Sequence, residues 1–554
     1  MTRKIFSMLV VVAVLSSLFV FSPATVEVAE AQGGGNTIIY NIFATDGYTN
    51  MADGTSTYIY GFIGGRAGVG LNYYDASTQT AMPYNAPAPT GGERAANELP
   101  LMGHAQLPGP AIYAEVNDVV EIRFKNLGIQ ANPIAPNDPH SIHLHGLDVD
   151  AANDGVPETS VGAVPANLCA DGSSDTTAPY DCAGAPGGLA SGAGNVIVYM
   201  FTATTPATSM WHCHQEADIH VQMGMYGALV IYNQGDPAAA NGGPGSGFGG
   251  RYNGFYYDKD IIMLLSEVDQ GYHASEGGTY DAFAGIATFL DTGNTNYTIG
   301  TTGVPAIWNP IDYHPQYWLI NGLSFPNTVQ VSVPGVFDWN EWHTAYPNYD
   351  PLIAGSVSLH GYSWTNQWQR VNQPGEKILI RMINMGYETQ PMHIHGYHLK
   401  VLGSDQRPWP WANRVLWGRP TPFDQGLEKN TILIGSGETY ELLVDMGQQS
   451  ATSMYETGTE TRYFDGSAAC ETSLGPGPYP AVDTPVSNTA TGCPEIPDAG
   501  NPANPNYIAG PTVTGLVGLG GTSQVFPFHN HDDYKATNNG AYPGGMFTAV
   551  IPLP

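Results

Sequence analysis

Short apolar segments separated by turn residues recur along the whole chain. They are rich in Val, Ile and Tyr, and each is bounded by Gly, Pro, Asn or Asp. Segments of this length and composition are typical of the strands of a β-sandwich. No long stretch has the periodicity of an amphipathic helix, so the pattern predicts an all-β fold. The expected strands lie within residues 111–128, 194–206, 226–233, 259–268, 376–386, 398–404, 430–446 and 546–553.

The amino-acid composition agrees with a turn-rich β protein. Only 12% of the 554 residues are charged, whereas the chain has 68 Gly and 43 Pro. This profile is unlike that of a helical bundle. The formal net charge is −31 with only 18 basic residues, which excludes nucleic acid as a partner and mildly favours cationic or neutral partners.

The first 31 residues have the features of a secretory signal peptide. Two basic residues, Arg3 and Lys4, precede an apolar run, and residues 29–31 (Ala-Glu-Ala) supply a small-residue cleavage site. The run is short for a membrane span, and no later segment is apolar enough to cross a bilayer. We therefore expect residues 1–31 to be removed and the mature protein to be secreted, either extracellular or periplasmic.

Five cysteines divide into two loop pairs and one that is left over. Cys169 and Cys182 lie in one polar loop, and Cys470 and Cys493 lie in another. In an oxidising compartment each pair most simply closes its own loop, although four cysteines allow three pairings. Cys213 then has no disulfide partner within this scheme, so it is a free thiol, an intermolecular bridge or a metal ligand.

An internal repeat of histidine pairs divides the chain into two halves. The first half carries PHSIHLHG and MWHCHQEADIHVQMGM, and the second carries TQPMHIHG and FPFHNH. A Gly/Pro-rich linker at 236–254 lies between the halves. We therefore expect two related domains, 32–235 and 255–554, the second with a loop-rich insertion at about 450–520. A third sandwich between 255 and 350 stays open as an alternative.

The H-x-H spacing and the odd cysteine point to metal chemistry. On a strand, both histidines of an H-x-H project to one side, and imidazole is a common metal ligand. In His212-Cys213-His214 the cysteine therefore faces away from both histidines, and one strand serves two sites with a covalent path for an electron between them. A thiolate with two imidazoles and a weak thioether is the ligand set of a blue-copper site. The candidates to complete this set are His140, His220 and Met225.

Four segments together resemble the copper-binding motifs of the multicopper oxidases. They are HSIHLHG, HCHQEADIHVQMGMYGALVI, QPMHIHGYHLKVLG and FPFHNH, and the similarity extends to YWLINGLSFP, GEKILIRMINMGY and TILIGSGETYELLVDM. The resemblance covers most of the mature chain. It implies tandem cupredoxin-like Greek-key β-sandwiches, and an enzyme that reduces O2 to water with electrons taken one at a time from a reductant.

The same resemblance implies four copper ions per chain, one of type 1, one of type 2 and two of type 3. Asp154 stands where the family often has an acid that guides protons to oxygen near type 2 copper. Glu216 and Asp218 are either solvated loop acids or contacts to substrate or to a ligand imidazole. The implied ligands are His140, Cys213, His220 and Met225 for type 1, His143 and His393 for type 2, and His145, His212, His214, His395, His529 and His531 for type 3.

The second half looks like a copy whose blue site has decayed. Gln390 and Asn530 stand where His140 and Cys213 stand in the first half, so we expect one type 1 copper per chain. This layout resembles the two-domain multicopper oxidases with the blue site in the first domain. Those enzymes form homotrimers, with the trinuclear cluster between neighbouring chains.

The loop after Cys213 leaves the axial ligand open between two methionines. Six residues separate Cys213 from His220, where the family usually has four. The extra length makes Met223 a rival of Met225 for the axial position. We favour Met225 because the stretch GMYGALVI that contains it matches the usual end of the family motif.

Two alternatives compete with an oxygen-reducing oxidase. A copper nitrite reductase shares the cupredoxin architecture and a first-domain blue site, but it needs only one further copper. Its reaction would leave His145, His214, His395 and His529 without a role. A copper carrier without catalysis would not need both ligand sets. The reductant stays open between phenols or amines, as in laccases, and metal ions, since bulk charge does not define a pocket.

Overall fold

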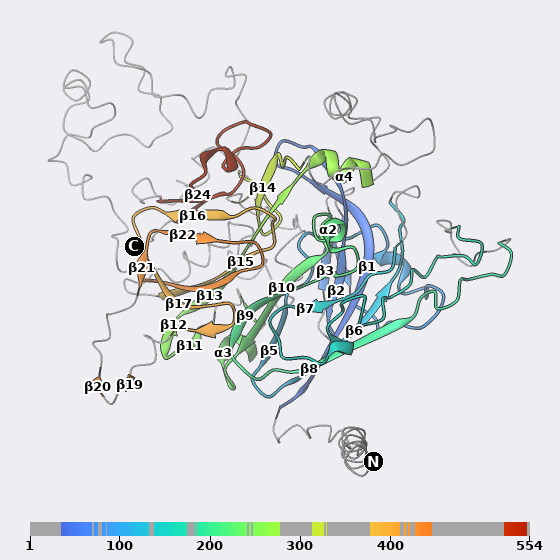
Figure 1. The fold of residues 1–554 in the computed structure, drawn as a ribbon, viewed down its shortest axis with the longest axis horizontal. Coiled ribbons are helices and arrows are strands. Elements are labelled where there is room, and N and C mark those ends of the chain that lie inside the picture. Colours follow the sequence, from blue (N-terminus) through green and yellow to red (C-terminus); the bar gives the residue numbers. More distant parts are fainter. Residues whose placement is uncertain are drawn as a thin grey trace, which may run out of the picture.

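The computed structural model describes residues 35–550 with internal gaps (Figure 1). The expected signal peptide at 1–31, the cysteines Cys470 and Cys493 and the 450–520 insertion lie outside the described residues. Among the residues that are described, no helix is long and apolar enough to cross a membrane. The gaps are 69–70, 76–79, 85, 132–137, 174–181, 183–184, 241–242, 245–247, 277–312, 326–327, 329–376, 410–414, 417–418, 421–426 and 446–525.

The first sandwich consists of two four-stranded sheets around one apolar core. Residues of both sheets meet there, as Phe62 and Trp211 do with ring centroids 4.6 Å apart. One sheet has the order β2 (Ser56–Arg66), β1 (Thr37–Asn50), β6 (Val119–Asn126) and β8 (Val196–Thr202). The other has the order β5 (Ile112–Glu115), β10 (Tyr226–Tyr232), β9 (Ala207–His212) and β7 (His143–Leu144).

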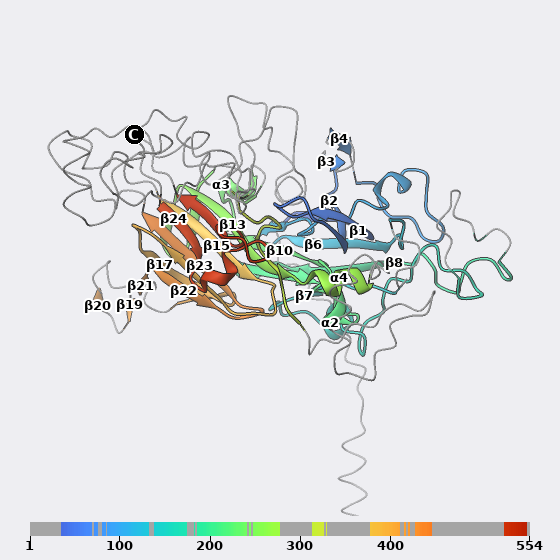
Figure 2. The same ribbon diagram turned by 90° about the horizontal axis from the view of Figure 1, so that it is seen from above.

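The second sandwich lies beside the first and pairs a large sheet with a four-stranded one (Figure 2). The large sheet has the order β14 (Tyr317–Ile320), β13 (Lys259–Val268), β15 (Lys377–Asn384), β23 (Thr439–Asp445), β17 (Leu399–Ser404) and β18 (Arg407–Pro408), with β21 (Glu428–Lys429) also on β17. The small sheet has the order β22 (Thr431–Ile434), β16 (Gln390–Ile394), β24 (Phe526–Asn530) and β25 (Phe547–Val550).

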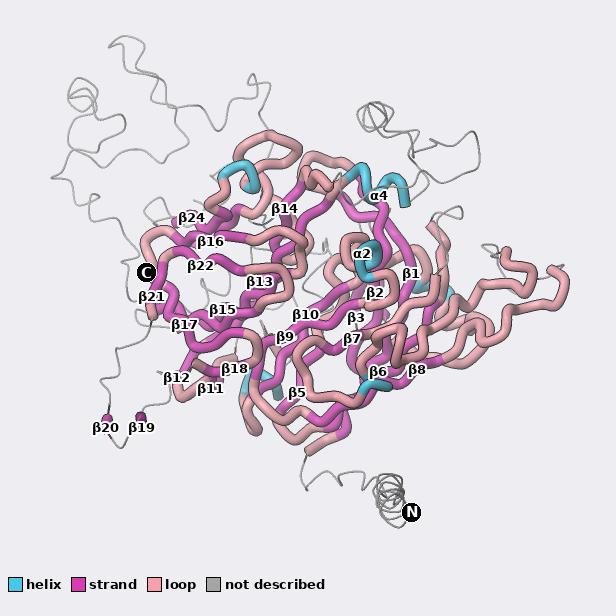
Figure 3. Tube along the Cα trace, in the orientation of Figure 1, coloured by secondary structure: helices cyan, strands magenta, loops and turns pink. Residues whose placement is uncertain are grey.

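The described helices are short and lie in the connections between strands (Figure 3). They are α2 (Ala217–His220), α3 (Pro237–Ala240), α4 (Gln270–Glu276) and the 3-10 turns η1 (Leu99–Leu101), η2 (Ala151–Asn153) and η9 (Asp533–Lys535). Three small hairpins complete the described structure: β3 (Leu71–Asp75) with β4 (Thr80–Tyr84), β11 (Gly250–Tyr252) with β12 (Phe255–Tyr257), and β19 (Val415–Leu416) with β20 (Arg419–Pro420).

A buried polar seam joins the two sandwiches. Arg381 of β15 is 1% exposed and forms an ion pair with Asp260 of β13 at 2.7 Å. The same guanidinium donates to the Thr208 hydroxyl of β9 at 3.1 Å, and the Thr208 backbone N–H donates to the Glu441 carboxylate at 2.7 Å. Because a buried charge is costly unless it is paired, this seam holds the two sandwiches in one arrangement.

The structure confirms the all-β fold that the hydrophobic pattern predicts. Each expected segment contains at least one strand, and KDIIMLLSEV coincides with β13. The pattern missed β1 and β2, the long hairpin at the start of the first sandwich. Nearly all positions of both strands are buried, so polar and apolar residues do not alternate along them. Of the described strands between 255 and 350, β13 and β14 join the large sheet of the second sandwich, and β12 pairs with β11.

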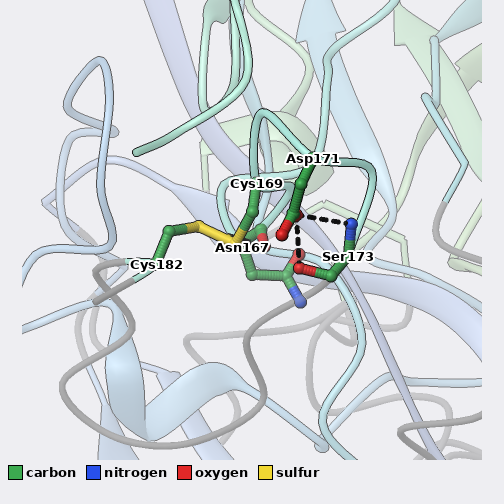
Figure 4. Close-up of a disulfide and its surroundings, with 5 residues drawn as sticks. All are labelled: Asn167, Cys169, Asp171, Ser173 and Cys182. Carbon is green, nitrogen blue, oxygen red and sulfur yellow. Dashed lines mark hydrogen bonds between the residues drawn. A yellow bond between two sulfur atoms is a disulfide. The ribbon is translucent and has the colours of Figure 1, made fainter. Parts of the chain in front are cut away.

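One of the two expected disulfides lies within the described residues. Cys169 and Cys182 are bonded, and the bridge closes the polar loop that follows β7 and η2 (Figure 4). Next to it, the Asp171 carboxylate accepts hydrogen bonds from the Ser173 backbone and hydroxyl. Cys213 is a free, buried cysteine, as the loop pairing of the other four cysteines predicts.

Candidate metal centres

Two antiparallel strand pairs bring the four H-x-H segments together in the same way in each sandwich. In the first, β7 pairs with β9 so that His143 lies opposite His212. In the second, β16 pairs with β24 so that His393 lies opposite His529. Because side chains alternate along a strand, the second histidine of each H-x-H shares a face with the first. We call His143, His145, His212 and His214 the first quartet, and His393, His395, His529 and His531 the second quartet.

The first quartet is compact and half-buried. The ring of His143 lies 5.0 Å from that of His212 and 5.1 Å from that of His214, between centroids. His145 completes the group, with its centroid 5.7 Å from His143 and 6.1 Å from His212. Burial lowers the pKa of His145 and lowers that of His212 to about 3. The rings of His145 and His212 are therefore neutral at physiological pH, which is the form that binds metals.

Hydrogen bonds at Nδ1 fix two rings of the first quartet. His212 Nδ1 lies 2.8 Å from the Cys213 carbonyl oxygen. His143 Nδ1 lies 2.8 Å from the Asp154 carbonyl oxygen and 3.1 Å from the Asp154 carboxylate. When Nδ1 donates to oxygen, Nε2 keeps its lone pair for a metal. Asp154, the acid that the sequence singles out, thus contacts His143 directly.

The second quartet has a similar arrangement of rings but is more exposed to solvent. The centroid of His393 lies 4.7 Å from His395 and 5.1 Å from His531. Nε2 of His395 and Nε2 of His529 are 3.1 Å apart. His393 Nδ1 is 2.9 Å from the Asn430 carbonyl oxygen. His395 and His531 are both exposed to solvent.

The two quartets are separate within this chain. Each ring contact between these histidines in the described structure lies inside one quartet, and none joins the first quartet to the second. In Figure 1, β7 and β9 run through the first sandwich, whereas β16 and β24 lie at the outer side of the second. Each quartet is therefore a set of four imidazoles whose ring contacts lie within the quartet itself.

A third cluster, which we call the thiol triad, consists of His140, Cys213 and His220. The Cys213 sulfur lies 3.9 Å from His140 Nδ1 and 3.4 Å from His220 Nδ1. All three side chains are buried, and their donor atoms lie within 4.8 Å of one another. The Ser141 backbone N–H donates to the sulfur at 3.4 Å, which favours the thiolate. The tyrosine Tyr60 packs its ring against both histidines.

The loop after Cys213 brings Met225 opposite the cysteine. Cys213 N–H donates to the Met225 carbonyl at 3.0 Å, continuing the register of β9 and β10. Residues opposite each other in an antiparallel pair share one face of the sheet. Met223 is also fully buried, but its N–H extends the turn of α2 by bonding to Ile219. Part of the stretch between Cys213 and Met225 forms α2.

Acidic residues lie at the outer edge of the triad. His220 Nε2 is 3.9 Å from the Asp138 carboxylate, and Asp138, Glu216 and His220 offer three ligand atoms within 4.8 Å of one another. Burial would lower the pKa of His220, but Cys213 and Asp138 outweigh it and raise the pKa to about 10. Burial and the neighbouring His220 lower the pKa of His140. The edge of His220 that faces away from the sulfur is thus lined by the carboxyl groups of Asp138 and Glu216.

Several residues of these clusters are not evident from the sequence. Asp138 precedes His140 by only two residues, but its carboxylate lies near His220, 82 residues away in the chain. Asn430 and Thr431 at the start of β22 orient His393, and nothing in their local sequence marks them. Only a general rule predicts that such orienting residues exist: metal-bound histidines in proteins usually make a second hydrogen bond through the other ring nitrogen.

Comparison with known proteins shows which family this chain resembles. The profile of a family described as "Multicopper oxidase" matches residues 88–235 and 340–454. Copper resistance protein A from Escherichia coli is 22% identical over 394 residues, which is 70% of this chain and 48% of that protein. The protein of the same name from Pseudomonas syringae pv. tomato is 22% identical over 399 residues, 71% of this chain and 49% of that protein. The chain thus spans about half the length of these curated relatives.

Solved structures of copper oxidases align with most of this chain at low sequence identity. Blue copper oxidase from Nitrosomonas europaea has 16% sequence identity and a TM-score of 0.42, with 93% of this chain and 85% of that chain covered. The multicopper oxidase mgLAC has the same identity and TM-score, with 93% and 86% covered. On the family profile, the curated relatives and the four histidine motifs, this chain belongs to the multicopper oxidase family of copper proteins.

Proposed function

We propose that this chain is a secreted multicopper oxidase that takes electrons one at a time from a reductant and uses them to reduce O2 to water. The observation that carries the proposal is the adjacency of two ligand sets along one strand. Cys213 belongs to the buried thiol triad, and His212 and His214 on either side of it belong to the first quartet. An electron received at the triad is thus one residue away from the quartet.

The donor atoms fit copper. A thiolate, two imidazoles and a thioether suit a blue-copper centre, and clustered imidazoles suit copper with open positions. Copper bound there would supply one-electron transfer at the triad and O2 reduction at the quartets, with four ions per chain. The proposed ligands are His140, Cys213, His220 and Met225 for type 1, His143 and His393 for type 2, and His145, His212, His214, His395, His529 and His531 for type 3.

The chain itself prepares the route between the two ligand sets. Ser141 N–H stabilises the thiolate, and the surrounding apolar core keeps water away from Cys213. Beside the covalent path through the backbone, the hydrogen bond from His212 Nδ1 to the Cys213 carbonyl offers a second short path. Both paths are rigid, because β9 and β10 hold the strand that carries them.

We assign Asp154 to proton supply and to the positioning of His143. The Asp154 carboxylate is 33% exposed, so it is open to proton exchange with solvent. The same carboxylate contacts the His143 ring. Reduction of O2 to water consumes protons, and a carboxylate at this place can hold one beside the quartet. The carbonyl oxygen of the same residue fixes the His143 tautomer.

We further propose that the protein works as a homotrimer in which the first quartet of one chain faces the second quartet of its neighbour. The separation of the two quartets within one chain supports this arrangement, as does the exposure of His395 and His531. A metal cluster with ligands from both quartets then forms only between chains. Closed cyclic assemblies of identical chains are the usual form of such heterologous interfaces.

The reductant is a small molecule or a metal ion that reaches the outer edge of His220. Asp138 and Glu216 make this edge negative, and the chain as a whole carries a net charge of −31. These charges favour metal cations such as manganese(II), iron(II) or copper(I), together with amines and neutral phenols, over anionic donors. We therefore describe the activity as laccase-like or metal-oxidising.

Oxygen uptake with a panel of donors tests the proposal. Copper-loaded protein should consume O2 with a phenol, an aromatic amine, manganese(II), iron(II) or copper(I), and His529→Ala should stop uptake while the blue colour stays. Turnover of nitrite with no O2 uptake from any donor would instead identify a copper nitrite reductase. Loss of the blue colour in His529→Ala would contradict the ligand assignment.

A further inference from the structure

The second sandwich repeats the backbone frame of the thiol triad without its ligands. In the first sandwich the Cys213 N–H donates to the Met225 carbonyl at 3.0 Å. In the second, the Asn530 N–H donates to the Met546 carbonyl at 2.9 Å. Each of these two residues lies between the histidines of an H-x-H. Asn530 and Met546 therefore occupy the places of Cys213 and Met225.

The same comparison identifies the counterpart of His220, which the sequence motif does not reveal. The Met225 N–H donates to the His220 carbonyl at 3.0 Å, and the Met546 N–H donates to the Lys535 carbonyl at 3.0 Å. Lys535 thus replaces His220. The equivalence is hidden in the sequence because ten residues separate Lys535 from Met546, whereas four separate His220 from Met225.

A hydrogen-bonded amide pair fills the space where the first sandwich has imidazole and thiol. Gln390, at the place of His140, accepts from the Asn530 side-chain amide at 2.6 Å. The same amide lies 3.4 Å from the Met546 sulfur. The Gln390 amide in turn donates to Glu267 at 3.0 Å. Gln390, Asn530 and Met546 are each 0% exposed.

The ammonium of Lys535 is buried and meets three acceptors. Its Nζ donates to the Thr389 carbonyl at 2.6 Å, and lies 3.3 Å from Glu388 and 3.4 Å from Asp532. The Lys535 side chain is only 3% exposed. An ammonium has three protons to donate, so these three oxygens satisfy it. Without them the burial of this charge would be strongly unfavourable.

Apart from the hydrogen bond to Glu267 of β13, the contacts of this network end on residues near the second quartet. Thr389 and Gln390 lie at the start of β16, just ahead of His393. Asn530 separates His529 from His531, and its side-chain oxygen accepts from the Asp532 N–H at 3.0 Å. The network therefore contacts β16 and β24 on the face opposite to the histidines and links the two strands there.

We propose that Gln390, Asn530 and Lys535 form a metal-free replacement for a blue-copper site, and that this network positions the second quartet before copper binds. The inference rests on the proposed function only in assuming that the quartet binds metal. Hydrogen bonds and ion pairs need no copper, so they set the spacing of the β16–β24 strand pair in the metal-free protein. Asn530 and Lys535 are positioning residues, since neither touches a reacting atom.

The test compares Asn530→Ala and Lys535→Met with Leu443→Ala in the full-length protein. Leu443 is buried in the large sheet, in a separate apolar cluster, so its substitution measures general destabilisation. Met in place of Lys535 keeps most of the side-chain volume, which guards against simple failure to fold. Thermal unfolding of each variant in the metal-free state measures how much each substitution destabilises the fold.

Two readouts separate positioning from stability. In the copper-free protein, the His531 amide, which bonds to the Pro391 carbonyl at 2.7 Å, should lose hydrogen-exchange protection in both network variants and keep it in Leu443→Ala. On titration with copper, the network variants should bind the trinuclear copper about 10- to 100-fold more weakly, with the blue absorption unchanged.

Equal protection and equal copper affinity in the network variants and in Leu443→Ala would overturn the inference. Wild-type protein that binds no copper beyond the blue site would refute the proposed function instead. In that case the exchange measurement on copper-free protein still decides whether the network positions the quartet.

Discussion

The Nδ1 atoms of His140 and His220 lie 3.2 Å apart in an interior that solvent hardly reaches. Two ring nitrogens at this distance must share a proton or a cation, because facing lone pairs repel each other. Burial lowers the pKa of His140, whereas Cys213 and Asp138 overcome the effect of burial on His220 and raise its pKa. A metal-free protein therefore keeps the proton on His220, and a metal ion would take its place.

The Cys213 sulfur contacts the two triad histidines and no histidine of the first quartet in the described structure, which makes its substitution selective. Cys213→Ser should abolish the blue colour and largely spare the trinuclear copper, because the hydrogen bonds at Nδ1 of His143 and His212 use backbone and Asp154 atoms. Visible absorption and copper content per chain check this. Simultaneous loss of the trinuclear copper would show that the two sites are not separable.

The register of β9 and β10 predicts which methionine tunes the blue site. Met225→Leu should change the reduction potential of the triad, since Met225 lies opposite Cys213, and Met223→Leu should leave the potential unchanged. A redox titration of the blue absorption in both variants decides between them. A shift in Met223→Leu alone would reverse the assignment of the axial ligand.

Asp154 is predicted to affect oxygen reduction without affecting the blue site. Asp154→Ala removes the carboxylate beside His143 and should lower O2 turnover or trinuclear copper affinity about 10- to 100-fold. The exposed Asp148 on the same loop supplies the matched control, Asp148→Ala. Oxygen uptake over a range of pH measures both variants, and equal rates in the two would remove Asp154 from the mechanism.

The pattern of the sequence predicts local features well and long-range ones poorly. The strands that follow from short apolar segments are present, and the H-x-H spacing correctly predicts histidines on one face with Cys213 on the other. The pattern does not predict the β1–β2 hairpin, because both faces of these strands are buried and polar and apolar residues therefore do not alternate. The seam between Arg381 and Asp260, and the place of Lys535, depend on contacts between distant segments that no local pattern encodes.

A buried glutamate where the two sandwiches meet makes stability depend on pH. Burial raises the pKa of Glu267 to about 7, although the Glu388 and Tyr387 N–H groups and Tyr313 favour its charged form. A carboxyl group whose pKa is raised in the folded state stabilises the fold at pH values below its ordinary pKa of 4.5. This stability is lost as the pH rises to about 7.

Substitution of this glutamate isolates its effect. The free energy of unfolding of the wild type should fall relative to that of Glu267→Gln by about 3 kcal/mol between pH 4.5 and pH 7.5. Urea unfolding of both proteins at several pH values measures the difference, and the contributions of other groups cancel. A constant difference across this range would show that Glu267 stays charged in the folded protein.

Copper content combined with spectroscopy distinguishes a four-copper oxidase from a protein with fewer metal sites. We expect four copper ions per chain in the fully loaded protein, one with blue absorption and two as a magnetically coupled pair. One or two ions per chain, or the absence of the coupled pair, would contradict the assignment of the two quartets to oxygen reduction.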